Sequence, residues 1–174
     1  MKSFYSLLLL LSISTVSVCQ TYITNVTLVD VENQKLIPQQ TVLISGSTIS
    51  KIQSSKETKI PLNAVVVDGK GKFLMPGLTD AHVHFFQSGG LYTRPDAIDL
   101  RKYTPYKNEI EWAHSNFEDL LRRYTKAGIT TVIDPGSTLN FLEQRKSFAD
   151  KAYSPTIYMT GPLLTTYEPE PYKN

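Results

Sequence analysis

Asp80, His82 and His84 are the three residues whose types and spacing point most clearly to chemistry, and they stand at every second position after Pro76-Gly77. In a β-strand, alternate side chains project from the same face, so the two imidazoles would lie about 7 Å apart along one side of the chain. Neutral imidazole nitrogens bind zinc and related divalent ions, which activate water for nucleophilic attack. The pair alone is a weak signal, because two histidines on a strand are often only exposed polar residues. Its weight therefore depends on the elements that position it.

The chain after Pro76 alternates between strand and helix. A helix is predicted to begin at a capping box formed by Ser115 and Glu118 and to stop at Gly128, and a second helix is predicted over 138–152. Apolar, β-branched runs predict strands over 78–84, 129–133 and 156–160. Strands that alternate with helices form a parallel sheet, and active sites of such sheets lie at the carboxyl ends of the strands. The histidine pair would stand at that end of the first strand.

Several other residues are candidates for the same face. Asp134 ends the second predicted strand, where it would contact substrate or cap the turn at Pro135-Gly136. Tyr92, Arg94 and Tyr103 fall in the long connection over 85–115, which is either functional or contains short helices, and their location makes them candidates for substrate contact. His114 precedes a helix and is interpreted as a surface or packing histidine.

The segment before Pro76 consists of short β runs separated by turn residues. Hairpin turns are predicted at Ser45-Gly46-Ser47 and at Asp68-Gly69-Lys70-Gly71. The strands that they join are predicted over 23–29, 41–44, 48–52, 65–68 and 73–75. Closely spaced strands of this kind are typical of a small β-sandwich, which we expect over residues 20–76.

The first 19 residues have the layout of a secretory signal peptide: Lys2 is followed by an apolar run over 7–13, which is too short to span a bilayer. Cleavage after Cys19 predicts export to the periplasm or the extracellular space, with no transmembrane span in the mature chain. A lipid anchor on Cys19 is the alternative. Because Cys19 is the only cysteine, a metal in the mature chain would be held by His, Asp, Glu or a modified Lys. The net charge of +2, without a basic run, argues against a nucleic-acid partner.

The stretch from Pro76 to His84 resembles the signature of the amidohydrolase superfamily, the metal-dependent hydrolases built on (β/α)8 barrels. Three further stretches support the resemblance. Residues 65–75 are similar to the β segment that leads into the barrel, and 127–134 match its second strand. Residues 161–165 resemble the end of the third strand in the imidazolonepropionase and prolidase-like branch. The predicted fold class is therefore α/β: a small N-terminal β-sandwich followed by the first three βα units of an incomplete (β/α)8 TIM barrel, over residues 77–174.

The resemblance implies that His82 and His84 are metal ligands and that Asp80 orients one of them or their strand. It implies a divalent ion, zinc before others and one or two in number, and hydrolysis of a C–N bond in a small-molecule or short-peptide substrate. The remaining ligands and the catalytic base have no counterpart in the sequence and are expected downstream of Asn174. A barrel of this type takes about 250 residues, whereas 97 run from Leu78 to Asn174.

We therefore expect an N-terminal portion of a longer enzyme, inactive by itself. Two alternatives remain open at this stage: a non-catalytic β-sandwich binding module, and a deaminase of the same fold. The oligomeric state has no signature in the sequence.

Overall fold

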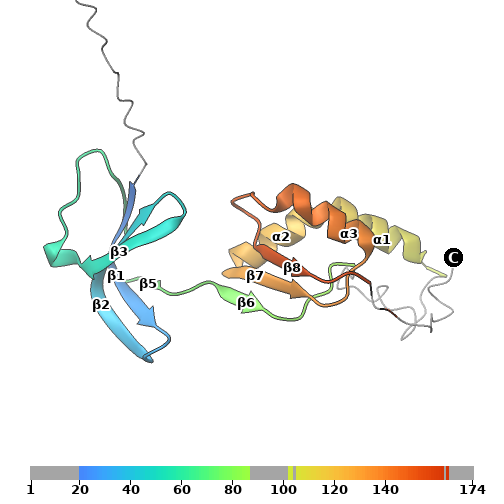
Figure 1. Cartoon of the computed structure of the whole chain (residues 1–174), viewed down its shortest axis with the longest axis horizontal. Coiled ribbons are helices and arrows are strands. Elements are labelled where there is room, and N and C mark those ends of the chain that lie inside the picture. The colour runs from blue at the N-terminus through green and yellow to red at the C-terminus, as the bar shows by residue number, and fades with distance from the viewer. Residues whose placement is uncertain (1–19, 87–101, 104, 163, 165–174) are drawn as a thin grey trace, which may run out of the picture. The chain divides into compact units, whose positions relative to one another are not determined.

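The computed structural model describes residues 20–86, 102–103, 105–162 and 164. The chain divides into two compact units, Met1–Pro76 and Gly77–Asn174. Each unit has its own sheet (Figure 1). The predicted signal peptide, with Cys19, lies outside the described residues, as do Tyr92 and Arg94. Among the helices that the structure describes, none combines the length and the apolar character needed to cross a membrane.

The first unit is built around one five-stranded sheet. Its strands are β1 (Gln20–Asp30), β2 (Lys35–Ser45), β3 (Thr48–Ser54), β4 (Val65–Asp68) and β5 (Phe73–Leu74), with the short 3-10 helix η1 (Ser55–Glu57) after β3. The order is β3-β2-β1-β4, and β5 also pairs with β1. The pairs β1–β2 and β2–β3 are antiparallel, while β4 and β5 run parallel to β1. The sheet is thus mostly antiparallel, as short strands joined by tight turns predict.

One of the two predicted hairpin turns is confirmed and the other is wrong. Gly46 has φ 60° in the turn between β2 and β3, a left-handed conformation that glycine adopts at little cost. Residues 68–71 do not reverse the chain, because β4 and β5 both run parallel to β1. Gly69 donates its N–H to the Thr24 carbonyl at 2.7 Å, so the turn is a local bend along the same edge.

The described residues of the first unit form this single sheet, and a β-sandwich requires a second one. The sandwich therefore stays a prediction.

The second unit is a parallel sheet with helices against it. Its elements are β6 (Leu78–Asp80), α1 (Tyr106–Ser115), α2 (Phe117–Lys126), β7 (Ile129–Asp134), α3 (Leu139–Gln144), the 3-10 helix η3 (Arg145–Phe148) and β8 (Thr156–Met159). The order is β6-β7-β8 with both pairs parallel, as predicted. The helices lie on one side of this sheet (Figure 1).

An aromatic core joins the helices to the sheet. Phe117, Leu121 and Phe141 are fully buried, together with Val132 of β7. The Phe117 ring meets the ring of Phe85 edge to face, with centroids 4.9 Å apart, an arrangement that adds to the stabilisation from burial. The core thus reaches from the helices to the segment that follows β6, where the two histidines are.

The helix boundaries differ from the prediction in two places. Ser115 is the last residue of α1, a helix within the long connection, so it cannot cap α2. Asn116 is the N-cap instead, without a side-chain capping bond, and Glu118 pairs with Arg122 at 2.7 Å. The apolar face of α2 and the stop at Gly128, with φ 81°, are confirmed. The helix predicted over 138–152 is shorter and tightens into η3.

Candidate metal centre

His82 and His84 follow β6 rather than lying within it. The predicted strand over 78–84 ends at Asp80, although the chain continues alongside β7 through a bond from Val83 N–H to the Ile133 carbonyl at 2.9 Å. The next ladder position is taken by a side chain, because Phe85 N–H donates to Asp134 Oδ2 at 3.1 Å. The alternation persists nonetheless: Val83 and Phe85 are buried, His82 is exposed and His84 is half-buried. Neither histidine belongs to the cluster of buried apolar residues that Val83 and Phe85 join.

The two imidazoles converge on one point. Their Nε2 atoms are 3.2 Å apart, and the rings meet edge to face with centroids 5.0 Å apart. With metal–nitrogen bonds of about 2.0–2.1 Å, this separation corresponds to an angle of about 100° at the ion, close to tetrahedral. The pair therefore fits two adjacent ligand positions of a divalent ion. Within the described part of the chain, no group of three or more His, Cys, Asp or Glu residues could hold a metal, so the pair is an incomplete site.

Asp80 supports the backbone beside the pair. Its Oδ1 accepts the N–H of His82 at 3.3 Å, so the carboxylate steadies the segment and does not contact an imidazole through any described hydrogen bond. The Tyr124 phenol, packed on the core, lies near this carboxylate. Burial raises the pKa of Tyr124 above its usual value, and the charges of Asp80 and Asp134 add to the rise. Tyr124 therefore remains a neutral hydroxyl at physiological pH.

Asp134 is fully buried at the end of β7. Its Oδ1 accepts the N–H of Gly136 at 3.2 Å, which caps the turn as one of the two interpretations of the sequence predicted. The same oxygen lies 3.5 Å from Nδ1 of His84. The carboxylate of Asp134 therefore faces the imidazole and the backbone. Its position does not support contact with substrate, which stays a prediction.

The remaining candidates are placed as follows. His114 packs as expected: its ring stacks on Phe141 with centroids 3.8 Å apart, and its Nδ1 lies 2.6 Å from Oε1 of Gln144. Tyr103 is exposed, with Lys102 Nζ 4.6 Å from the centre of its ring. Substrate contact by Tyr103, and by Tyr92 and Arg94 outside the described residues, stays a prediction.

Several known proteins have a chain similar to part or most of this one. The molinate hydrolase structure superposes with a TM-score of 0.63 at 25% identity, covering 84% of this chain and 30% of that one. A prolidase complexed with N-methylphosphonate-L-proline superposes with a TM-score of 0.61 at 23% identity, covering 82% and 32%. Dihydroorotase from Staphylococcus aureus is 40% identical over 57 residues, which are 32% of this chain and 13% of the relative.

Over most of its length the chain is similar to proteins of the amidohydrolase superfamily. The two superposed structures show that it corresponds to about 30% of the length of such a hydrolase. No protein-family model matches the sequence. The resemblance first seen in the residues from Pro76 to His84 is thus confirmed, and the prolidase structure shares the fold of this chain.

One residue of the superfamily signature has a structural role that the sequence pattern did not reveal. A Cβ at Gly77 would overlap the side chain of Thr130, whereas nothing lies within 4 Å of a Cβ at Gly161. Gly77 therefore lets the chain pass close to β7 just before β6 begins, at Leu78, whose N–H donates to the Gly128 carbonyl at 2.9 Å. Close packing against a neighbouring strand is the part of the role of Gly77 that the sequence pattern does not show.

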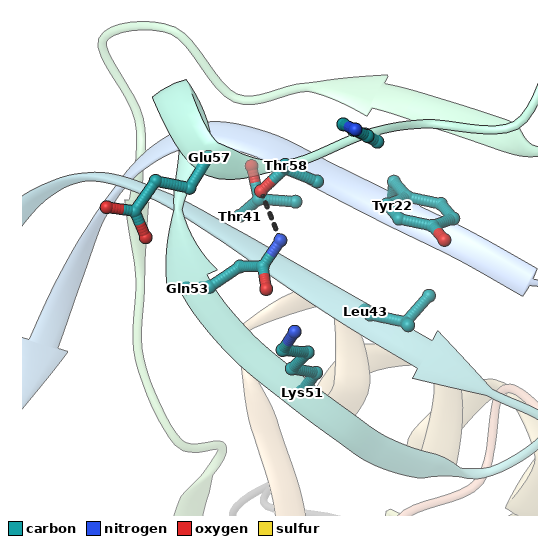
Figure 2. Close-up of a pocket in the computed structure, with 8 residues that line it drawn as sticks. Tyr22, Thr41, Leu43, Lys51, Gln53, Glu57 and Thr58 are labelled. Atoms are coloured by element: carbon teal, nitrogen blue, oxygen red, sulfur yellow. Dashed lines mark hydrogen bonds between the residues drawn. The ribbon is translucent and has the colours of Figure 1, made fainter.

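A hollow of about 300 Å³ lies in the first unit, lined by residues of the sheet and of the segment that follows β3 (Figure 2). Two of its lining side chains bond each other, because Gln53 Nε2 donates to Thr58 Oγ1 at 2.9 Å (Figure 2). Thr41 Oγ1, also in the lining, lies 2.9 Å from Oγ of Ser55 in η1. Ser55 Oγ also accepts the N–H of Asn25 at 3.1 Å. The Thr41 and Asn25 contacts of Ser55 tie η1 to the sheet.

Proposed function

We propose that this chain is the N-terminal portion of an exported, metal-dependent amidohydrolase that cleaves a C–N bond in an amide, cyclic amide or peptide-like substrate. The observation that carries the proposal is the pair of Nε2 atoms, 3.2 Å apart, just beyond the first strand of a parallel sheet. The names of the similar hydrolases support a small-molecule or short-peptide substrate. A deaminase of the same fold is the second reaction type, and the later strands decide between them.

His82 and His84 would hold the ion through Nε2, and zinc is among the divalent ions that imidazole ligands suit. When bound, the ion supplies Lewis-acid activation of a water molecule and polarises the bond to be cleaved. Asp80 holds the backbone at His82, and the buried core beneath Val83 and Phe85 fixes the segment that carries both rings. The remaining ligands and the base come, in this proposal, from beyond Asn174, with one or two ions in the complete centre.

The three strands β6, β7 and β8 are proposed as the first three strands of a (β/α)8 barrel. Within the described residues, β6 and β8 each pair only with β7, so both have a free edge to which further strands can add. The five-stranded sheet is likewise proposed as one half of a β-sandwich. In this proposal, residues beyond those described here complete both the barrel and the sandwich.

Export through residues 1–19 is part of the proposal. Expression with and without these residues, followed by N-terminal sequencing of the product, tests it. A mature product that begins at Gln20 supports the signal peptide, a C19S variant that loses membrane association supports a lipid anchor, and an uncleaved cytoplasmic product contradicts both.

The enzymatic proposal is tested on the reading frame extended through the DNA downstream of Asn174. We expect bound zinc and hydrolysis of a panel of dipeptides, N-acyl amino acids and cyclic amides, with ammonia release scored separately for the deaminase. His82→Ala and His84→Ala should abolish metal retention and turnover, whereas His114→Gln, outside the site, should keep both. Turnover that survives the loss of both His82 and His84 would refute the proposal.

A further inference from the structure

Asp134 and His84 form a contact that the two-histidine site does not by itself require. We propose that Asp134 is a positioning residue, which holds the neutral His84 imidazole as its Nδ1–H tautomer so that the Nε2 lone pair faces the metal position. The role in metal binding rests on the proposed function. The tautomer itself can be measured in this chain without any metal.

The first support is the environment of the carboxylate. Asp134 is fully buried, and its oxygens accept the N–H groups of Phe85 at 3.1 Å and of Gly136 at 3.2 Å. A buried carboxylate is costly unless donors surround it, and an imidazole N–H is a third donor within reach. The Phe85 bond also fixes the backbone one residue beyond His84. The carboxylate of Asp134 thus restrains His84 in two ways: it lies beside the imidazole ring, and it binds the N–H of the next residue, Phe85.

The second support is the state of His84 Nδ1. This atom is buried and makes no hydrogen bond with the part of the chain that the structure describes, yet it lies 3.5 Å from Asp134 Oδ1. A buried ring N–H without a partner is unfavourable, and a shift of a few tenths of an ångström would bring it into hydrogen-bond range of the carboxylate. The geometry therefore favours a proton on Nδ1, because an unprotonated Nδ1 would face a negative charge.

The third support comes from the partner imidazole. Two neutral rings whose Nε2 atoms are 3.2 Å apart cannot both carry a proton on Nε2, because the two hydrogens would collide. At least one ring must therefore leave its Nε2 unprotonated, and a proton on Nδ1 makes His84 such a ring. His82 then donates from its Nε2 when no metal is bound. In this arrangement the Nε2 lone pair of His84 is free to bind an ion, whereas His82 must first move its proton from Nε2 to Nδ1.

The test is the tautomer of each histidine in the 174-residue chain without metal, measured at a pH where both rings are neutral by long-range ¹H–¹⁵N NMR of the imidazoles. We expect His84 in the Nδ1–H form and His82 in the Nε2–H form. In Asp134→Asn the carboxylate charge is lost, and we expect His84 to shift toward the Nε2–H form that free histidine prefers. Zinc affinity should fall about 10- to 100-fold, as for other residues that support a ligand imidazole.

Two internal controls separate positioning from simple unfolding. His114, whose Nδ1 lies 2.6 Å from Gln144 Oε1, reports whether the second unit is folded, so its resonances should not move in Asp134→Asn. Asp119→Asn makes the same chemical change at an exposed residue that pairs with Arg123 and should leave the His84 tautomer unchanged. If Asp134→Asn fails to fold, the wild-type spectrum still decides the question.

An Nε2–H tautomer of His84 in the wild type would overturn the inference, as would a tautomer that is unchanged in folded Asp134→Asn. Failure of zinc to bind at the pair would refute the proposed function instead. The inference about Asp134 would still be decided by the tautomers, because these are measured without metal.

Discussion

The two units differ in how they bury their apolar residues. In the second unit, Phe117, Leu121 and Phe141 are fully buried between the helices and the three-stranded sheet. In the first unit, Val26 and Val42 are buried, but many large apolar side chains of the sheet are about half exposed, among them Ile49, Ile52, Val65, Val66, Val67 and Phe73. The unit that presents the histidines therefore contains its own core.

An apolar hollow of about 310 Å³ in the first unit, lined mostly by aliphatic side chains of β1, β2 and β3, shows the same difference. Large exposed apolar patches generally mark interaction surfaces. The contrast teaches that packing within the second unit can position the candidate metal site, while the first sheet leaves a larger share of its apolar side chains exposed.

The largest effect is expected from the core of the second unit. Leu121→Ala should lower the free energy of unfolding by about 2–5 kcal/mol, because a fully buried leucine leaves a cavity. Leu139→Ala is the matched control at an exposed leucine in the same unit and should change the stability by less than about 0.5 kcal/mol. Trp112, the only tryptophan, lies in α1 and makes fluorescence a reporter of this unit. Equal losses in both variants would contradict the described core.

The second-largest loss of stability is expected at two glycines, one in each unit, whose backbone packs closely against a neighbouring strand. A Cβ at Gly77 would meet Thr130, and a Cβ at Gly69 would meet Val26 and the Thr24 carbonyl oxygen, so each alanine variant should cost about 1–3 kcal/mol. Gly161→Ala, with open space around it, is the control. Chemical unfolding followed by Trp112 fluorescence should report the Gly77→Ala change, while loss of β-sheet circular dichroism should report the change in Gly69→Ala. If Gly69→Ala shifted the Trp112 transition as much as Gly77→Ala, the separation into two units would be wrong.

The smallest effect is a dependence on acid in the first unit. A hydrogen bond from the Asn25 side chain, at 3.0 Å, is the main cause that lowers the pKa of Asp68 below its usual value. A lowered pKa in the folded state gives stability that is present above the unfolded pKa, near 3.8, and is lost as the pH falls through the folded value.

Unfolding measured at pH 7 and pH 3 checks this dependence. Asp68→Asn should lose less stability between the two conditions than the wild type. Asn25→Gly, which removes the donor and keeps the left-handed backbone of φ 57°, should behave in the same way. An unchanged pH dependence in both variants would show that the bond does not contribute.

Strand periodicity and turn residues were sufficient to predict most strands, the parallel order of the second sheet and the apolar face of α2. They failed where a non-local contact decides the structure. The turn at 68–71 looked like a hairpin because its glycines are local signals, whereas the parallel pairing of β4 with β1 depends on residues more than 40 positions apart. Ser115 and Glu118 matched a capping box, but α1 occupies Ser115.

The candidate site was only partly predictable, because it too depends on non-local contacts. His-x-His spacing indicates a shared face, and the structure places the two Nε2 atoms together. The supporting acids could not be assigned from spacing. Asp80 is closest in sequence but contacts the backbone of His82, whereas Asp134 reaches His84 from another strand. Which carboxylate serves a ligand imidazole depends on strand pairing, which a local pattern does not encode.

The central claim is that His82 and His84 form one half of a metal centre, and zinc titration of the 174-residue chain tests it most directly. Calorimetry and NMR of the imidazoles should show binding weaker than micromolar, with the ring resonances of His82 and His84 shifted and those of His114 unmoved. His82→Ala or His84→Ala should abolish the binding, and the chain should not hydrolyse amides. Zinc binding that is indifferent to both variants, or stoichiometric binding at micromolar affinity or tighter together with turnover, would contradict the account.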